Sequence, residues 1–441
     1  MAGTVAAVQF LASEIAAAVG GTLVGPDVEV AGAAIDSRLV QAGQLFVAVI
    51  AERDGHDFIE ASAASGAVAA LTSRPVEARL SSIVVPDTVA ALSRLGALAR
   101  QRLTGPVVGI TGSVGKTSTK DLAATVLGER HVVAASEKSF NNELGVPLTL
   151  VNAPADTEVA VVEMGSRGIG HVAWLCEMAQ PTIAVVTAVD IVHTESMGDL
   201  DTVARAKGEL VESLPSSGIA VLNGDDERVA AMAGRTTAWA VRYGFEAGDV
   251  RAVDVELGPD LRARFRLESA WGSAEVHLGV RGLHQVGNAL AAAAVALVCE
   301  MPVDEVAAGL ELGALSPWRM DLQTSPSGTR VLNDAYNAGP TSMEAALRAL
   351  AHLDAARHHA VLGPMAELGE HGPVAHRRIA ALAGELGVQL VVVGTDEYGV
   401  EPVAGVDAAL VALGELGSDD AVLVKGSRVA GLERVADKLL G

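Results

Sequence analysis

The stretch from Gly109 to Ser118, Gly-Ile-Thr-Gly-Ser-Val-Gly-Lys-Thr-Ser, constrains the fold of this chain more than any other. It follows the apolar run Val107–Ile110 and opens a helical pattern, so a buried strand, a glycine-rich turn and a helix succeed one another. The glycines of such a turn let backbone N–H groups approach phosphate oxygens, and the helix N-terminus adds partial positive charge. The stretch therefore predicts a phosphate-binding loop rather than a tight turn with a surface lysine.

Within this loop, Lys116 is expected to reach the β- and γ-phosphates, and the hydroxyl of Thr117 is expected to bind Mg²⁺. The usual Gly-x4-Gly-Lys spacing is not met, because Ile110 lies five positions before Gly115 and the glycine lies one residue earlier. We predict nucleotide contacts from seven residues of the loop: Gly112, Ser113, Val114, Gly115, Lys116, Thr117 and Ser118.

Three further side chains are candidates for the same region. Glu163 follows the apolar run Glu158–Val162, and a carboxylate at the carboxyl end of a buried strand suits a metal beside a phosphate loop or the start of a helix. His193 lies beyond the predicted strand Ile183–Val189, where an imidazole is a metal ligand or, more commonly, structural. Lys207 belongs to a helical pattern, in which a solvated lysine is the ordinary expectation.

Charge and composition exclude several classes of function. The 32 Lys and Arg residues against 54 Asp and Glu residues give a formal net charge of −22, which disfavours general binding to nucleic acid or anionic membranes. A phosphorylated small molecule needs only a few local hydrogen-bond donors, so the net charge does not exclude that such a molecule binds. Aromatic residues make up 3% of the chain, so a base-stacking surface is not expected either.

Hydropathy does not indicate a membrane protein, although its mean of +0.35 is high. Arg38 is the first basic residue, so the apolar N-terminal stretch lacks the positive region of a signal peptide. The longest uncharged stretch, between Arg281 and Glu300, fits a buried Ala-rich helix better than a membrane span. The two cysteines are too far apart in sequence for a disulfide framework. We expect a soluble, cytoplasmic, multidomain α/β protein.

The pattern of apolar runs divides the chain into three blocks, 1–104, 105–314 and 315–441. In the central block, continuous apolar strands alternate with helices, which is typical of a parallel sheet covered on both faces. The segment Asp249–Val280 is rich in strand patterns and is expected to form an antiparallel appendage, followed by a helix over Gln285–Cys299. The third block alternates again and predicts a smaller doubly wound domain.

Motifs in all three blocks occur in an order that resembles the Mur ligases of peptidoglycan synthesis. The run Phe140–Thr149, which contains Asn141-Asn142-Glu143, is more similar to the type that adds D-alanyl-D-alanine than to relatives that add one amino acid. Besides this run and the phosphate loop with its early glycine, the matching stretches are Asp36-Ser37-Arg38, Gln41–Ala48, Asp54–Phe58, Glu163-Met164-Gly165, His193, Ala206–Glu209, Gly282–Leu290, Arg319-Met320, Asn333–Ala338, Leu362–Gly369 and Lys425–Arg428.

The resemblance implies a three-domain architecture: an N-terminal domain (1–104) for the UDP-muramoyl substrate, a central P-loop ATPase domain (105–314) and a C-terminal Rossmann-like ligase domain (315–441). It implies an ADP-forming ligase that joins D-alanyl-D-alanine to UDP-N-acetylmuramoyl-tripeptide through an acyl phosphate, the final cytoplasmic step of the pentapeptide precursor. The implied cofactors are ATP, two Mg²⁺ ions and a carbamylated Lys207. We expect a monomer without nucleic acid or membrane partners.

The resemblance also implies roles for individual residues. Lys116, Glu163, His193 and Lys207 would act at the reacting centre, and the metal ligands would be Thr117, Glu163, His193 and the Lys207 carbamate. The nucleotide would further contact Asn288, Arg319, Asn333, Asp334, Tyr336 and Asn337, and the other substrate Ser37, Arg38, Asn141 and Asn142. Gln285, Gly339 and Pro364 depart from the residues usual in the family.

Several alternatives stay open at this stage. A related Mur ligase that adds a single amino acid, or a folylpolyglutamate synthase-like ligase, shares much of the pattern. A P-loop protein without ligase activity would need only the phosphate loop. Lys207 could be an ordinary salt-bridged lysine, and the Asn and Ser residues assigned to substrate could serve turns.

Overall fold

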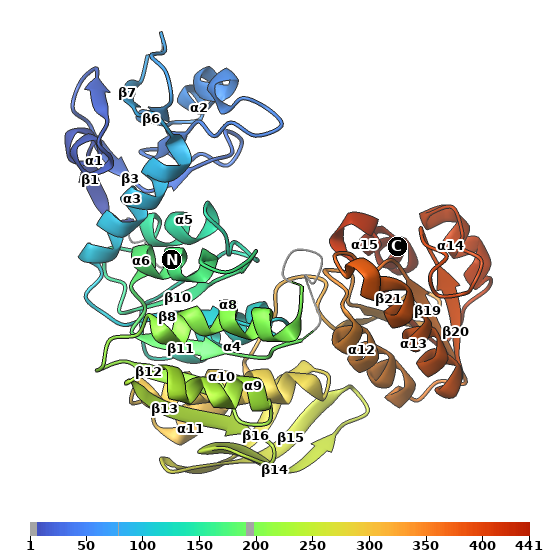
Figure 1. Cartoon of the computed structure of the whole chain (residues 1–441). Helices are drawn as coiled ribbons and strands as arrows, with labels where there is room; N and C mark the ends of the chain where they lie inside the picture. Colours follow the sequence, from blue (N-terminus) through green and yellow to red (C-terminus); the bar gives the residue numbers. More distant parts are fainter. Residues whose placement is uncertain (1–6, 78, 191–197) are drawn as a thin grey trace.

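The computed structural model describes residues 7–77, 79–190 and 198–441, which form three bodies along the chain (Figure 1). The N-terminal body holds a sheet in the order β2-β7-β6-β5-β4, parallel except where β2 meets β7. Its elements are β1 (Gln9–Leu11), α1 (Ala12–Val19), β2 (Thr22–Val24), β3 (Glu29–Ala31), β4 (Ala33–Ala34), β5 (Leu45–Val47), α2 (Ile59–Ala64), β6 (Ala69–Thr72), β7 (Ser81–Val84) and α3 (Thr88–Arg102).

The central body contains a sheet in the order β16-β15-β14-β13-β12-β11-β8-β10-β9. Its parallel part comprises β8 (Val107–Thr111), β9 (Val133–Ala135), β10 (Val159–Glu163), β11 (Ile183–Val186), β12 (Ile219–Asn223) and β13 (Trp239–Gly244). Strands β14 (Val250–Leu257), β15 (Arg262–Ser269) and β16 (Gly272–Arg281) continue it as an antiparallel meander. The predicted appendage is therefore an extension of the same sheet, joined through β13 and β14.

Helices cover both faces of the central sheet, as the uninterrupted apolar strands require. On β8, Val107 faces a core shared with α3, α5 (Gly145–Val151), α6 (His171–Ala179) and α8 (Leu200–Glu212). Val108 and Ile110 face the opposite core with α4 (Lys116–Gly128), α10 (His284–Val298) and α11 (Val303–Glu311). Strand β8 lies between β10 and β11 in the sheet. Its carboxyl end therefore lies at the point where the strand order reverses, which is where ligands bind in sheets of this kind.

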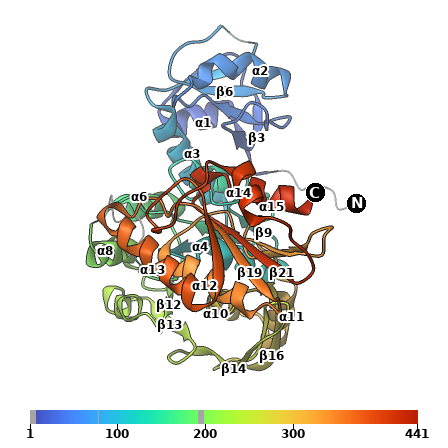
Figure 2. The same ribbon diagram turned by 90° about the vertical axis from the view of Figure 1, so that its right-hand side faces the viewer.

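The N-terminal and central bodies share one continuous hydrophobic core through α3. Gly96 on α3 allows a close approach to α5 and α6, because a Cβ atom there would lie 2.7 Å from Pro147 Cβ and 2.9 Å from Met178 Sδ. The Asn152 side chain donates to the Ala33 carbonyl and accepts from its N–H, both at 2.9 Å. These contacts join the two bodies into one packed unit. In Figure 2, α3 leads from the N-terminal body at the top of the view toward the central body.

The C-terminal body is a smaller doubly wound domain with the strand order β17-β18-β21-β19-β20. All its strands pair in parallel except β17 with β18. Its elements are β17 (Asp321–Thr324), β18 (Arg330–Asn333), α12 (Pro340–His352), β19 (Arg357–Leu362), α13 (Gly372–Glu385), β20 (Val388–Val392), α14 (Val406–Leu413), β21 (Asp420–Lys425) and α15 (Glu433–Leu440). Leu261, from the turn between β14 and β15, is buried in the core of this body.

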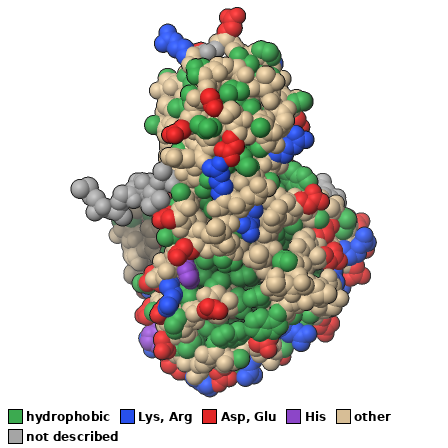
Figure 3. Space-filling view, turned by 90° about the vertical axis from the view of Figure 1, so that its left-hand side faces the viewer, with side chains coloured by type: hydrophobic (Ala, Val, Ile, Leu, Met, Phe, Trp, Pro, Cys, Tyr) green, Lys and Arg blue, Asp and Glu red, His purple; other side chains and the backbone are tan. Residues whose placement is uncertain are grey.

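The predicted α/β class and three-part architecture are confirmed, with local differences. Strand β11 ends at Val186 rather than Val189, because Thr187 turns toward the phosphate loop, where its hydroxyl donates to the Val114 carbonyl at 2.5 Å. Several short helices, among them α1, α2, α11 and α14, were not predicted. No helix within the described ranges is long and apolar enough to cross a membrane. On the face away from the C-terminal body, charged side chains surround a broad area of hydrophobic ones (Figure 3).

The close approach at Gly96 generates a prediction. Gly96→Ala should lower the first thermal unfolding midpoint by several degrees, because the added methyl overpacks the α3 contact and such overpacking costs about 1–3 kcal/mol. The control is Gly128→Ala at the end of α4, where an added Cβ meets nothing within 4 Å. Calorimetry that shows the same midpoint for both variants would contradict a tight α3 junction.

Candidate functional site

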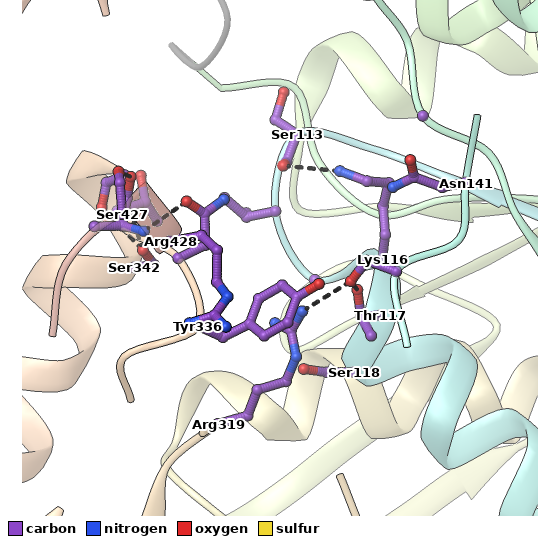
Figure 4. Close-up of a pocket in the computed structure, with 18 of the residues that line it drawn as sticks. Ser113, Lys116, Thr117, Ser118, Asn141, Arg319, Tyr336, Ser342, Ser427 and Arg428 are labelled. Atoms are coloured by element: carbon purple, nitrogen blue, oxygen red, sulfur yellow. Dashed lines mark hydrogen bonds between the residues drawn. The ribbon is translucent and has the colours of Figure 1, made fainter. Parts of the chain in front are cut away.

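A cavity of about 830 Å³ lies between the central and C-terminal bodies, with the phosphate loop on one wall (Figure 4). The central body supplies residues from the carboxyl ends of its strands and from α8 and α10. The C-terminal body supplies residues from the segment before β17, from α12 and from the turns after β18, β19 and β21. The central residues include Ser113–Ser118, Ser139, Asn141, Asn142, Glu163, Arg167, His171, Lys207, His284, Gln285 and Asn288, and the C-terminal ones include Arg319, Asp334, Tyr336, Asn337, Glu367, Lys425, Ser427 and Arg428.

The phosphate loop has the conformation that its glycines predicted. Gly115 adopts a φ of 85°, and a Cβ atom there would lie 2.4 Å from the Oδ1 atom of Asn288. Asn288 therefore packs directly on the loop, and only glycine fits beside it. The Lys116 ammonium folds back to donate to the carbonyls of Gly112 at 2.7 Å and Ser113 at 3.2 Å. This places the lysine charge over the loop, where a phosphate would bind.

Glu163 ends β10 and is 1% exposed. Its Oε1 atom accepts a hydrogen bond from Asn141 Nδ2 at 2.8 Å, whereas its Oε2 atom is buried without a hydrogen-bond partner. Nearby, the hydroxyl of Thr117 lies 3.2 Å from that of Ser139. A buried carboxylate oxygen without a partner is costly, and a hard divalent cation would satisfy it. The chemistry of this donor set therefore fits Mg²⁺.

Lys207 lies on α8 and is 2% exposed, so it is not the solvated lysine that its helical pattern would ordinarily indicate. Burial, together with the nearby charge of Lys116, holds the pKa of Lys207 well below its usual value. Among the described residues, no carboxylate forms an ion pair with it. His193 lies outside the described residues, and those that are described contain no group of three His, Cys, Asp or Glu residues able to hold a metal.

The C-terminal wall brings a second cation toward the loop. The guanidinium of Arg319 stacks 4.3 Å from the centre of the Tyr336 ring, and its Nη2 atom lies 3.5 Å from Ser139 Oγ. Figure 4 shows Arg319 and Tyr336 facing Lys116 and Thr117. The pKa of Lys116 is lowered, mainly by burial. Glu163 opposes this shift, and the positive charge of Arg319 adds to it. The cavity therefore concentrates positive charge that an anionic ligand would relieve.

Some predicted residues have local roles in addition to, or instead of, facing the cavity. The carboxylate of Asp334 pairs with Lys425 and accepts from the Met320 N–H at 3.1 Å. Asn333 does not line the cavity, and its Oδ1 atom accepts from Ala335 N at 3.2 Å. Asn142 lines the cavity and also accepts from the N–H groups of Leu144 and Gly145, where α5 begins.

Two substrate candidates lie far from this cavity in the N-terminal body. Arg38 pairs with Asp36 at 2.6 Å and its side chain is 86% exposed, while Ser37 precedes it in the same turn. The cavity lining does not include either residue. Their assignment to the uridine nucleotide stays a prediction for a separate region of the protein.

The three departures from the family pattern have local structural consequences. Gln285 accepts from Asn288 Nδ2 at 2.8 Å and contacts His284, so it helps to orient the asparagine on the loop. Gly339 precedes α12 with an extended backbone. The Pro364 carbonyl accepts from Ser427 N at 3.0 Å.

Sequence reasoning did not assign roles to several residues of the cavity. Arg167, His171 and His284 line the central wall, and Lys425, Ser427 and Arg428 line the C-terminal wall. The signal for the last group was present, since Lys425 ends the apolar strand β21, as Glu163 ends β10, and Ser427 and Arg428 follow it. Arg428 stacks 4.5 Å from the Trp318 ring, a contact between residues 110 positions apart that spacing does not reveal.

Comparison with protein families matches residues 110–296 to the Mur ligase middle domain and residues 318–428 to the Mur ligase glutamate ligase domain. A Mycobacterium bovis protein named UDP-N-acetylmuramoyl-tripeptide--D-alanyl-D-alanine ligase is 42% identical over 92% of this chain and 91% of its own length. An Escherichia coli protein of the same name is 33% identical over 97% of both chains.

Solved structures agree. MurF from Acinetobacter baumannii superposes with a TM-score of 0.89 at 29% identity, covering 99% of this chain and all of its own. MurF from Thermotoga maritima, solved in complex with ADP, gives a TM-score of 0.81 at 27% identity and covers 92% of this chain and 96% of its own. A folylpolyglutamate synthase from Mycobacterium tuberculosis shares the fold alone, with a TM-score of 0.59 at 19% identity, covering 79% of this chain and 95% of its own. The chain belongs to the Mur ligase family, and within it to the branch of the UDP-N-acetylmuramoyl-tripeptide--D-alanyl-D-alanine ligases.

Proposed function

We propose that this protein joins D-alanyl-D-alanine to UDP-N-acetylmuramoyl-tripeptide and cleaves ATP to ADP and phosphate. A terminal carboxylate oxygen of the tripeptide attacks the γ-phosphorus, and ADP leaves. The amine of D-alanyl-D-alanine then attacks the acyl carbon, loses a proton and expels phosphate. The observation that carries this proposal is the cavity in which the phosphate loop and Glu163 face Arg319 of the other body.

Charge is the main demand of the first step, because a carboxylate and a triphosphate repel each other. Lys116 lies over the phosphate loop, and Arg319 approaches from the C-terminal wall, so the two side chains can neutralise the phosphates from opposite sides. Both are held by contacts within the protein, Lys116 by loop carbonyls and Arg319 by the Tyr336 ring. Such preorganised charge stabilises a transferring phosphoryl group without reorganisation at the moment of reaction.

Thr117 and Glu163 are the described residues that would hold Mg²⁺ beside the loop. Bound there, Mg²⁺ would neutralise phosphate charge as a Lewis acid. Asn141 holds the first oxygen of Glu163 and so leaves the second oriented for a ligand. A second metal ion near His193, which we also propose, would involve residues outside the described ranges.

We further propose that Lys207 is carbamylated. In this reaction the neutral amine attacks the carbon of CO₂ and loses a proton, which replaces a cation by an anion with two oxygens. Burial and Lys116 lower the pKa of Lys207, so the neutral amine that carbamylation requires is more accessible than on an exposed lysine. The absence of an ion-pair partner among the described residues speaks against the ordinary salt-bridged lysine.

The other contacts follow the family resemblance. Asn288, Asp334, Tyr336 and Asn337 border the cavity and would shape the nucleotide site, with Asn333 supporting the turn after β18. Asn141 and Asn142 would contact the muramoyl peptide, and Ser37 and Arg38 the uridine nucleotide in the N-terminal domain (1–104). The central (105–314) and C-terminal (315–441) domains would share ATP. We propose a cytoplasmic monomer that binds neither nucleic acid nor membranes.

The amine substrate distinguishes this activity from the alternatives. Phosphate release from ATP should require both UDP-N-acetylmuramoyl-tripeptide and D-alanyl-D-alanine, and single D- or L-amino acids should support less than about 1% of the rate, since specificity for a substrate of this polarity can exceed 10⁴-fold. Faster release with L-lysine or meso-diaminopimelate and a dipeptide precursor would instead indicate a ligase that adds the third stem residue. Release without any amine would indicate an ATPase.

Lys116 tests the phosphate loop. Lys116→Ala should lower kcat about a thousandfold, because the charge that stabilises the transferring phosphoryl group is lost. The control is Lys438→Ala, a lysine on α15 that pairs with Asp407 at the surface and should leave kcat unchanged. Both variants are compared by phosphate release after circular dichroism has shown them folded. Near-native turnover of folded Lys116→Ala would refute the loop assignment.

Lys207 tests the carbamate. Lys207→Ala should be nearly inactive, and acetate should restore part of the activity by filling the vacated anion position. Lys207→Arg keeps a positive charge but cannot be carbamylated in the same way, so it should stay inactive. Acetate should not rescue Lys116→Ala. A Lys207→Arg variant with activity close to wild type would show that positive charge is what matters at this position.

A further inference from the structure

Helix α4 carries, one turn beyond Lys116, a buried ion pair that the mechanism above does not use. The Lys120 ammonium lies 2.8 Å from Asp121 Oδ1, and the side chains are 3% and 12% exposed, respectively. Burying two charges is costly unless their remaining hydrogen-bonding positions are filled. Both residues fill these positions with backbone groups from distant segments, one on each side of the phosphate site.

The Lys120 ammonium holds the loop after β9. It donates to the Ser136 carbonyl at 2.7 Å and to the Lys138 carbonyl at 2.9 Å. Lys138 has a φ of 48°, a left-handed conformation that a lysine adopts only when surrounding contacts impose it. The next residue, Ser139, lies 3.2 Å from Thr117 Oγ1. Lys120 therefore fixes the segment that brings a hydroxyl to the proposed metal ligand.

Asp121 holds the linker to the C-terminal body. Its Oδ2 atom accepts a hydrogen bond from the Ser316 N–H at 2.7 Å, across 195 positions of sequence. Three residues later, Arg319 reaches Ser139 Oγ at 3.5 Å. The flanking residues Trp318 and Met320 have φ angles of 61° and 50°, so this short segment is held in an unusual conformation on both sides of the arginine.

We infer that Lys120 and Asp121 form a positioning pair that couples the two walls of the ATP site. Lys120 fixes the segment that carries Ser139, and Asp121 fixes the linker that leads to Arg319. The side chains of Ser139 and Arg319 meet beside Thr117. Lys120 and Asp121 both lie on α4, the helix that begins at the phosphate loop. Their hydrogen bonds therefore oppose a displacement of either wall relative to the loop. The inference rests on the proposed function and adds to it the residues that place Arg319 against the loop.

The anchoring itself is tested without any activity. In wild-type protein the Ser316 amide should exchange with solvent slowly, and Asp121→Ala should speed exchange of the peptide containing Ser316 about tenfold or more, because its acceptor is removed. The control is Glu305→Gln, which breaks the exposed 3.1 Å pair between Arg130, just beyond α4, and α11. Equal exchange of this peptide in wild type and Asp121→Ala would overturn the inference, whatever the protein catalyses.

The coupling is tested by a double-mutant cycle on kcat/KM for ATP, with the tripeptide and D-alanyl-D-alanine saturating. Asp121→Ala alone should lower kcat/KM about 10- to 100-fold, the range expected for a misplacement near 1 Å. In the Arg319→Ala background the same change should cost less than about twofold, because the residue through which Asp121 acts is already absent. Equal losses in both backgrounds would show a merely structural role and overturn the coupling.

Lys120, the other member of the pair, provides an independent test if the Asp121→Ala variant does not fold. Lys120→Met should lower kcat/KM in the wild-type background and have little further effect after Ser139→Ala; equal losses would again overturn the coupling. Glu305→Gln should match wild type throughout. If wild-type protein turns over no ATP with these substrates, the proposed function fails, and the exchange measurement still decides whether the pair holds the linker.

Discussion

The burial of cations in one cavity is the constraint on which the rest of the site depends. Lys116 and Lys207 both line the cavity, and burial lowers the pKa of each. Lys116 lowers the pKa of Lys207 further, and Arg319 lowers that of Lys116, whereas Glu163 raises it. A chain with a net charge of −22 could easily have placed carboxylates against all of them, yet Lys207 has no such partner among the described residues. The cavity therefore carries positive charge that an anionic ligand would neutralise.

Much of the site could be predicted because its signals are local. The phosphate loop needs only a strand, glycines and a helix in immediate succession. Gly115 occurs where close packing against Asn288 leaves no room for a side chain, and Gly112 occurs where Thr187 does the same. Glu163 was placed correctly because the carboxyl ends of neighbouring parallel strands meet at one edge of a sheet. Lys207 was placed on the correct helix, whereas its burial could not be read from a pattern typical of solvated helices.

Features that depend on contacts between distant segments could not be predicted. The stacking of Arg428 on Trp318 and the bond from Ser316 to Asp121 join residues whose separation in sequence carries no periodic signal. Short or Ala-rich helices such as α14 bury little surface in a regular stripe and so gave no clear pattern. The place of Leu261 in the C-terminal core likewise depends on tertiary packing, since its local sequence fits an ordinary turn between strands.

The position of Leu261 affects how the C-terminal body can move relative to the rest of the molecule. The C-terminal body contacts the rest of the molecule near Ser316, where Leu261 enters its core, and through hydrogen bonds such as that from His352 to the Leu257 carbonyl. A body attached by a linker alone could rotate in any direction. Here, a rotation that withdraws Leu261 would expose an apolar side chain and open a cavity in the C-terminal core, which is energetically costly. The position of Leu261 therefore favours those movements of the C-terminal body that keep this side chain buried.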